Sequence, residues 1–202
     1  MAEPLRLLDP GFRYGAALVG VLFATYLNAA TDFTAYIVSA GYAGSLGSDV
    51  PLLNIVQFVT IVALYVVSFA IIPGSPARRL AAVTLAVVVL MLWATFGILR
   101  GTGRIAEAGG FWFVALDQGL IALVVAVGGW LLVRGRHPLA FVVLVVAAIP
   151  PIVARLMVDA EVPEGAYTLV IQGIVWLGGI GAAWAGWAID RAVRARRDRV
   201  AA

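Results

Sequence analysis

The sequence predicts an all-α fold, a polytopic membrane protein built as a bundle of six transmembrane helices with the N- and C-termini in the cytoplasm. Six apolar stretches of about 20 residues, the length at which a helix crosses a bilayer, fill most of the 202 residues. Hydrophobic residues make up 63% of the chain and charged residues 12%, against about 25% charged in soluble domains. The arginines between the stretches alternate from side to side. We therefore expect residues 1–202 to form one integral membrane domain.

Each stretch is expected to be a helix, because lipid offers no hydrogen-bond partner to an irregular backbone. The predicted spans are 14–31, 51–73, 80–99, 111–133, 138–158 and 166–189. The second and third are separated by the turn sequence Pro73-Gly74-Ser75-Pro76. The fifth contains Pro150-Pro151, which predicts a bend or break, since proline lacks a backbone donor and clashes with the preceding turn. The sixth is expected to continue into the basic run at 191–200.

The distribution of arginine predicts the orientation. Eleven arginines fall in the two tails and in the loops after the second and fourth spans: Arg6, Arg13, Arg78, Arg79, Arg134, Arg136, Arg191, Arg194, Arg196, Arg197 and Arg199. The other side receives three: Arg100, Arg104 and Arg155. Because basic loops stay in the cytoplasm, this bias predicts cytoplasmic termini and an even number of spans. The expected location is the cell membrane of a bacterium.

An alternative concerns the first span. Arg6 and Arg13 followed by a short apolar run resemble a signal peptide ending near Ala30. Leu27 and Asn28 stand where a cleavage site would have small residues, so we favour the uncleaved interpretation. Cleavage would leave five spans and an outside N-terminus.

Several chemistries are excluded by composition. Cysteine is absent, so thiolate catalysis, disulfides and cysteine-ligated metals are not available. The single histidine, His137, lies in a loop, and paired-histidine haem ligation is therefore excluded. The positive charge follows from orientation rather than from nucleic-acid binding. We expect no cofactor and no bound metal.

Asp117 is the most informative single residue. It lies six residues into the fourth span, about 9 Å below its outer end at about 1.5 Å per residue. A carboxylate at this depth costs a few kcal/mol, on the order given for charged groups in membranes, unless it is paired, hydrated or protonated. Gln118 beside it also needs hydrogen-bond partners. The pair indicates either an ion, proton or solute site or a polar tether between helices.

Arg155 follows the proline pair near the outer end of the fifth span. One interpretation has it facing a cavity and pairing with Asp117 or Asp32. The other has its long side chain snorkelling to the lipid headgroups. The sequence leaves both open.

Further polar residues lie at a similar depth in other spans. Asn54, Gln57, Tyr65 and Ser68 share one face of the second span, interrupted by Ile61. The candidate site residues in the outer third of the bundle are Asn28, Asp32, Asn54, Gln57, Asp117, Gln118, Arg155, Gln172 and Trp176. This clustering predicts an outward-facing polar pocket beneath the long outer segment 32–50, which is either an interfacial loop or a lid.

Small residues recur at helical spacing in three spans: Ala16, Gly20 and Ala24; Ala115, Gly119, Ala122, Ala126 and Gly129; and Gly178, Ala182 and Gly186. Such seams let helices approach closely. We expect them to pack within the chain, with binding of a partner membrane subunit as the alternative.

Three functions are compatible with this pattern. The first is binding or transport of a small solute or ion, as a transporter or as its membrane-embedded substrate-binding subunit. In helix number and placement of termini the predicted architecture is similar to the substrate-binding membrane subunits of energy-coupling-factor vitamin transporters, a likeness of architecture without a shared motif. The second is a non-catalytic accessory or assembly subunit of a larger membrane complex. The third, which we favour least, is a lipid-processing enzyme using Asp117. Membrane lipids are expected partners in each case.

Overall fold

A computed structural model describes residues 10–37, 50–101, 111–134, 142–143, 145–150, 152 and 164–201. All regular secondary structure in these segments is helical. The elements are α1 (Pro10–Ile37), α2 (Val50–Ile71), α3 (Pro76–Gly101), α4 (Phe111–Ala122), the π-helical segment η5 (Leu123–Gly128), α5 (Gly129–Arg134) and α7 (Glu164–Ala201). The predicted all-α class is therefore confirmed for the described part of the chain.

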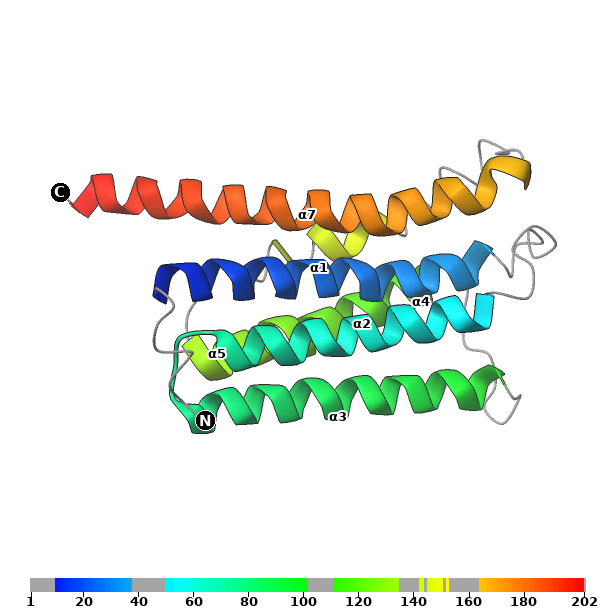
Figure 1. The fold of residues 1–202 in the computed structure, drawn as a ribbon, viewed down its shortest axis with the longest axis horizontal. Helices are drawn as coiled ribbons and strands as arrows, with labels where there is room; N and C mark the ends of the chain where they lie inside the picture. Colours follow the sequence, from blue (N-terminus) through cyan, green and yellow to red (C-terminus); the bar gives the residue numbers. More distant parts are fainter. Residues whose placement is uncertain are drawn as a thin grey trace.

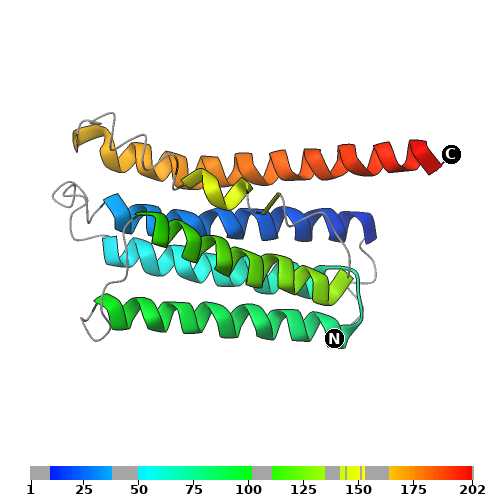
Figure 2. The same cartoon turned by 180° about the vertical axis from the view of Figure 1, so that it is seen from behind.

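The helices lie roughly side by side along one direction, and α1 occupies the centre (Figure 1). It packs against α2 on one side and α7 on the other, and also contacts α4. Seen from behind, the rod formed by α4, η5 and α5 lies across α1 and α2 (Figure 2). Residues 24–30 of α1 are all buried, with exposed fractions of 0–1%. The segment that a signal peptide would remove thus contributes part of the core of this bundle.

The turn between α2 and α3 is built by local chemistry. Pro76 occupies the first helical position of α3, where its missing N–H costs nothing because that donor has no intrahelical partner. The Ser75 hydroxyl oxygen accepts a hydrogen bond from the backbone N–H of Arg78 at 3.4 Å, as a helix N-cap does. The predicted turn sequence therefore marks the true start of α3, four residues before the predicted apolar span begins.

The predicted spans agree with the helices except at some ends. The fourth predicted span, 111–133, matches the continuous rod from Phe111 to Arg134. α1 continues to Ile37, so the first part of the expected outer loop is helical; the sequence after Asp32 has Phe33, Tyr36 and Ile37 at helical spacing. The expected continuation of the last span into its basic run is confirmed, since α7 reaches Ala201. The loop 38–49 and most of the fifth predicted span, including Pro151, lie outside the described residues.

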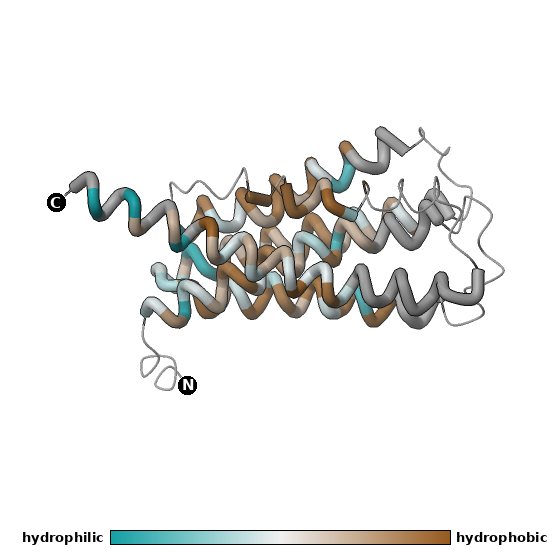
Figure 3. The backbone as a smooth tube through the Cα atoms, turned by 90° about the horizontal axis from the view of Figure 1, so that it is seen from above, coloured by the Kyte–Doolittle hydropathy of each residue, from teal (hydrophilic) through white to brown (hydrophobic). Residues whose placement is uncertain are grey.

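Among the described side chains, the exposed faces of α2 and α3 are largely apolar, and part of the interior of the bundle is polar. Leu116 and Leu177 are 68% and 71% exposed, and similar side chains cover the outer faces of α2 and α3. Thr25, Asn28, Gln57, Ser68 and Gln118, in contrast, are buried. Hydrophilic residues of α7 gather toward its C-terminal end (Figure 3). Burial of a large apolar side chain stabilises a protein in water by about 1.5–3 kcal/mol, so this distribution is unfavourable in water and favourable in lipid.

Two helices of the described chain are long and apolar enough to cross a membrane, Pro76–Leu99 and Leu116–Arg134, and Ile55–Ile71 is a shorter apolar helix. In the helix Pro76–Leu99, 17% of the most apolar window is buried in the bundle, and in Leu116–Arg134 the share is 39%. A core helix of a soluble protein would be mostly buried. The low burial therefore distinguishes these two helices from such core helices.

Glycine allows α7 to lie close against α1. A Cβ at Gly178 would overlap the Tyr26 hydroxyl and lie 2.8 Å from the ring carbon Cζ, and one at Gly186 would overlap Leu22 Cδ1. Ala182, between them, is buried. This predicted seam therefore packs within the chain. By contrast, a Cβ at Gly181 would meet nothing within 4 Å.

The other two seams also contribute internal contacts. A Cβ at Gly20 of α1 would overlap the Ser68 hydroxyl of α2, and one at Gly129 would lie 2.7 Å from Phe69 Cε2. Gly119 differs, since a Cβ there would meet nothing within 4 Å. The fourth-span seam is thus a packing surface at Ala122, Ala126 and Gly129, but not at Gly119, and the side chain of Ala115 lies outside the described part.

Candidate functional site

The amide side chains of Asn28, Gln57 and Gln118, here called the amide cluster, come from α1, α2 and α4. All three are 1% exposed. Asn28 Nδ2 donates to Gln118 Oε1 at 2.5 Å. Gln57 Nε2 donates to the backbone carbonyl oxygen of Leu27 at 3.1 Å. The cluster therefore ties α2 and α4 to successive residues of the central helix.

One acceptor of this cluster is not satisfied. The buried Asn28 Oδ1 has no hydrogen-bond partner among the described residues. A buried acceptor without a donor costs about 1–3 kcal/mol, so such oxygens are normally met by a protein group, an ordered water or a ligand. The amide cluster is therefore able to accept a hydrogen bond from a small donor group.

A second polar contact lies next to the amide cluster. The Thr25 hydroxyl donates to the Val21 carbonyl oxygen at 2.8 Å, and its oxygen lies 3.0 Å from the Tyr65 hydroxyl oxygen. Because the single Thr25 proton is used for Val21, Tyr65 is the donor in the second bond. The Tyr65 hydroxyl therefore donates to Thr25 and connects α2 to α1.

The predicted polar face of α2 is confirmed where its side chains are described. Gln57, Tyr65 and Ser68 are buried, as is Ile61 between them, whereas Val59 and Val67 on the opposite side are more than half exposed. The helical period brings the polar residues together toward α1. Asn54 lies three residues before Gln57 on the same face of the backbone, but its side chain is outside the described part.

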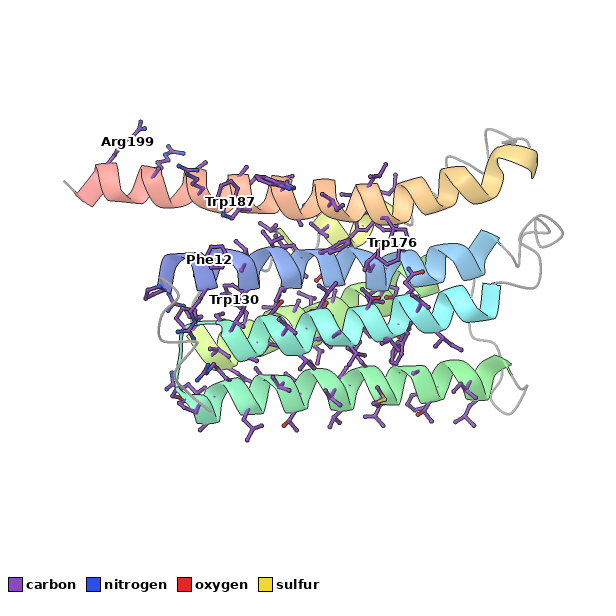
Figure 4. All side chains as sticks on the ribbon, in the orientation of Figure 1. Phe12, Trp130, Trp176, Trp187 and Arg199 are labelled. Atoms are coloured by element: carbon purple, nitrogen blue, oxygen red, sulfur yellow. The ribbon has the colours of Figure 1, made fainter. Side chains whose placement is uncertain are left out.

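The two hydrogen bonds that define the amide cluster do not involve Asp117 or Trp176. Asp117 precedes Gln118 in α4, so its side chain points about 100° around the helix from that of Gln118, and it is partly exposed. Trp176 of α7 packs edge-to-face against Phe23 of α1, with ring centroids 6.3 Å apart at 69°. Figure 4 shows Trp176 between these two helices. Its described role is packing at the α1–α7 interface.

Other predicted site residues are placed only by their backbones. Asp32 lies on α1 one turn beyond Asn28, and Gln172 lies on α7 one turn before Trp176. The side chains of both are outside the described residues. Arg155, and with it the predicted pairing with Asp117 or Asp32, is outside the described chain altogether.

Two features escaped the sequence interpretation. The six-residue π-helical segment η5 interrupts the rod between α4 and α5 and buries Val125 and Ala126. Only the pair Gly128-Gly129 marks it in the sequence. Thr25 was also missed, because a threonine in a helix commonly bonds its own backbone, as this one does with Val21. The segment η5 is of interest because short π-helical segments are frequent at functional sites.

Comparison with known proteins finds no family model, no curated protein and no solved structure that matches the chain.

Proposed function

We propose that the protein is a multi-pass membrane protein of six spans, with α3 and the rod from α4 to α5 crossing the bilayer and both termini in the cytoplasm. The apolar outer surface and the low burial of these two helices support membrane insertion. Orientation is supported by arginines at one end of the bundle, where α1 and α3 begin and α5 ends, with the basic run of α7 on that side (Figure 1). The cell membrane is the proposed location.

Within this frame, we propose that the bundle binds a small solute or ion in its outer half, as a transporter or as its substrate-binding subunit. The observation that carries the proposal is the unpartnered Asn28 Oδ1 inside the amide cluster. Buried polar groups in a membrane protein face the bundle or a cavity and mark ligand pathways. The ligand should carry a hydrogen-bond donor. A cationic ligand would also interact with the carboxylate of Asp117, on the neighbouring face of α4.

The second candidate function is a non-catalytic subunit of a larger membrane complex. It is favoured by the internal pairing of Asn28 with Gln118, which acts as a tether between helices. The outer face of α7 also presents Leu177 and Trp184 around Gly181, an exposed small residue flanked by large ones. Small residues of this kind permit close helix packing.

The first function is tested by thermal unfolding of the protein in detergent. Tryptophan fluorescence reports the unfolding, and each of a panel of small polar solutes and ions is added in turn. A ligand at about 100 times its Kd stabilises the folded state by about 2.7 kcal/mol, which raises the Tm of a chain of this size by about 5–10 °C. Asn28→Leu should abolish that shift, because it removes the acceptor. The matched control is Thr60→Val on α2, whose hydroxyl bonds only its own Val56 carbonyl oxygen in the contacts described.

The two candidate functions give different outcomes in this experiment. A ligand-dependent shift in the native protein and in Thr60→Val, absent from Asn28→Leu, supports the binding function. An equal shift in all three proteins would contradict a site at the amide cluster. Failure of every solute, together with stoichiometric co-purification of another membrane protein, would favour the accessory function instead.

A further inference from the structure

Four arginines lie at the end of the bundle where α1 and α3 begin and α2 and α5 end. Arg13 Nε donates to the Ile71 carbonyl oxygen at 2.9 Å, and Arg79 Nη1 donates to the Ala70 carbonyl oxygen at 2.7 Å. The guanidinium carbon of Arg134 lies 5.3 Å from the Tyr14 ring centroid. Arg78 precedes Arg79 in the first turn of α3 and is exposed. We refer to Arg13, Arg78, Arg79 and Arg134 as the basic corner.

Packing holds the basic corner in place. The Tyr14 ring meets the fully buried Trp130 edge-to-face at 5.4 Å and 79°. Figure 4 shows Trp130 at the same end of the bundle as Phe12 of α1. In the turn, a Cβ at Gly74 would lie 2.6 Å from Val133 Cγ1, so the turn lies directly against the end of α5. The four helix ends are therefore fixed to one another rather than merely close in the sequence.

Among the described side chains, positive charge and hydrogen-bond donors are in excess at this corner. The C-terminus of α2 supplies the equivalent of about half a negative charge, against four guanidinium groups. Asp117 is the only carboxylate among the described side chains, and it lies 17 residues before Arg134, about 25 Å along the rod. Each guanidinium has five N–H groups, and the buried Nε of Arg79 has no partner among the described residues. The corner is therefore suited to an anion with several acceptor oxygens.

Exposed leucines border the arginines on the outer faces of the helices. Leu80 follows Arg79 and is 67% exposed, and Leu131 and Leu132 precede Arg134 and are exposed as well. A phosphate with acyl chains would match both surfaces, whereas a free phosphate would use only the arginines. Basic sites between helices on the cytoplasmic side are known to take anionic lipid headgroups.

We propose that the basic corner binds the phosphate of an anionic phospholipid, with the acyl chains lying along the exposed faces of α3 and α5. This inference rests on the membrane insertion proposed above, and not on the solute-binding function. Arginine suits this role because its planar guanidinium bonds phosphate oxygens in pairs.

The test measures lipid binding to the purified protein in neutral detergent, by thermal unfolding and native mass spectrometry, during titration with phosphatidylglycerol or phosphatidylcholine. The test variant combines Arg78→Gln with Arg134→Gln, which leaves the helix-capping Arg13 and Arg79 intact. The control combines Arg196→Gln with Arg199→Gln on the exposed end of α7 (Figure 4). A basic residue contributes on the order of 1 kcal/mol to anionic-lipid binding only where it lies close to the headgroup. The corner variant should therefore bind phosphatidylglycerol at least about tenfold more weakly, and the control, whose arginines lie outside the basic corner, should keep the native affinity.

Retention of phosphatidylglycerol affinity in the corner variant, or an equal loss in the control, would overturn the proposal. Equal stabilisation by phosphatidylcholine would overturn the headgroup specificity. If inorganic phosphate alone raised the Tm as much as phosphatidylglycerol does, the assignment of the bound phosphate to a lipid would be overturned. A protein that stays monodisperse without detergent would contradict membrane insertion itself, so that failure is separable from failure of the lipid site.

Discussion

Replacement of Gly178 by leucine is expected to separate α7 from α1 and to destabilise the bundle by about 1–3 kcal/mol or more, the cost typical of overpacking. Even the first added carbon would overlap the Tyr26 hydroxyl. Tyr26 is 1% exposed, and its ring carbon Cζ lies 2.8 Å from the position of that added carbon. Thermal unfolding in detergent should show a decrease in Tm of several degrees.

Gly181→Leu is the matched control for Gly178→Leu. Gly181 lies three residues further along α7, is exposed, and would present its new side chain to open space. Leucine also has a higher helix propensity than glycine by up to about 1 kcal/mol, so this variant should be as stable as the native protein or slightly more so. Equal destabilisation of both variants would contradict the described contact between α7 and α1.

Trp130→Ala is expected to have the largest effect of any substitution considered, a loss of about 3–5 kcal/mol in the free energy of unfolding. Trp130 has no exposed surface, and its indole supports Tyr14 at the point where α1, α2 and α5 meet. Its removal would leave a cavity and also release the ring over which Arg134 lies. Chemical or thermal unfolding followed by circular dichroism measures the loss.

Trp184→Ala removes the same side chain from the outer face of α7, where it is 62% exposed. Its main described contact is an edge-to-face one with Trp187 at 5.5 Å, so the expected change is about 0.5–1.5 kcal/mol. If Trp184→Ala were as destabilising as Trp130→Ala, the assignment of inner and outer faces would be wrong.

The helices could largely be predicted from the sequence because spans follow from hydropathy and length alone. Their ends were less predictable. Asp32 appeared to end the first span, yet a single acid at the rim does not stop a helix whose next turns are aromatic and aliphatic, and α1 continues to Ile37. The segment η5 could not be predicted, since its residues are as apolar as their neighbours and hydropathy does not report the hydrogen-bond register.

For the candidate site, the sequence predicted that the polar residues lie at a similar depth in their helices, but not which groups they bond. Asn28 does bond Gln118, and Gln57 bonds the backbone of the adjacent Leu27, because a buried polar side chain is costly unless it is hydrogen-bonded. The hydrogen-bond partner of each amide depends on the rotation of its helix about the helix axis, and hydropathy and residue spacing do not give that rotation. Asp117 stood out by charge, but its position one residue from Gln118 places it on another face. Its pairing with Arg155 remains a prediction.

The absence of cysteine from the chain permits a direct test of the central claim, that this is a multi-pass membrane protein with its basic end in the cytoplasm. Single cysteines would be introduced as Ser75→Cys before α3, Thr102→Cys after it, and Ala201→Cys at the end of α7. A membrane-impermeant thiol reagent applied to intact cells should label only Thr102→Cys, and the other two should react only after permeabilisation. Labelling of Ser75→Cys and Thr102→Cys from the same side would show that α3 does not cross the membrane and would contradict the account.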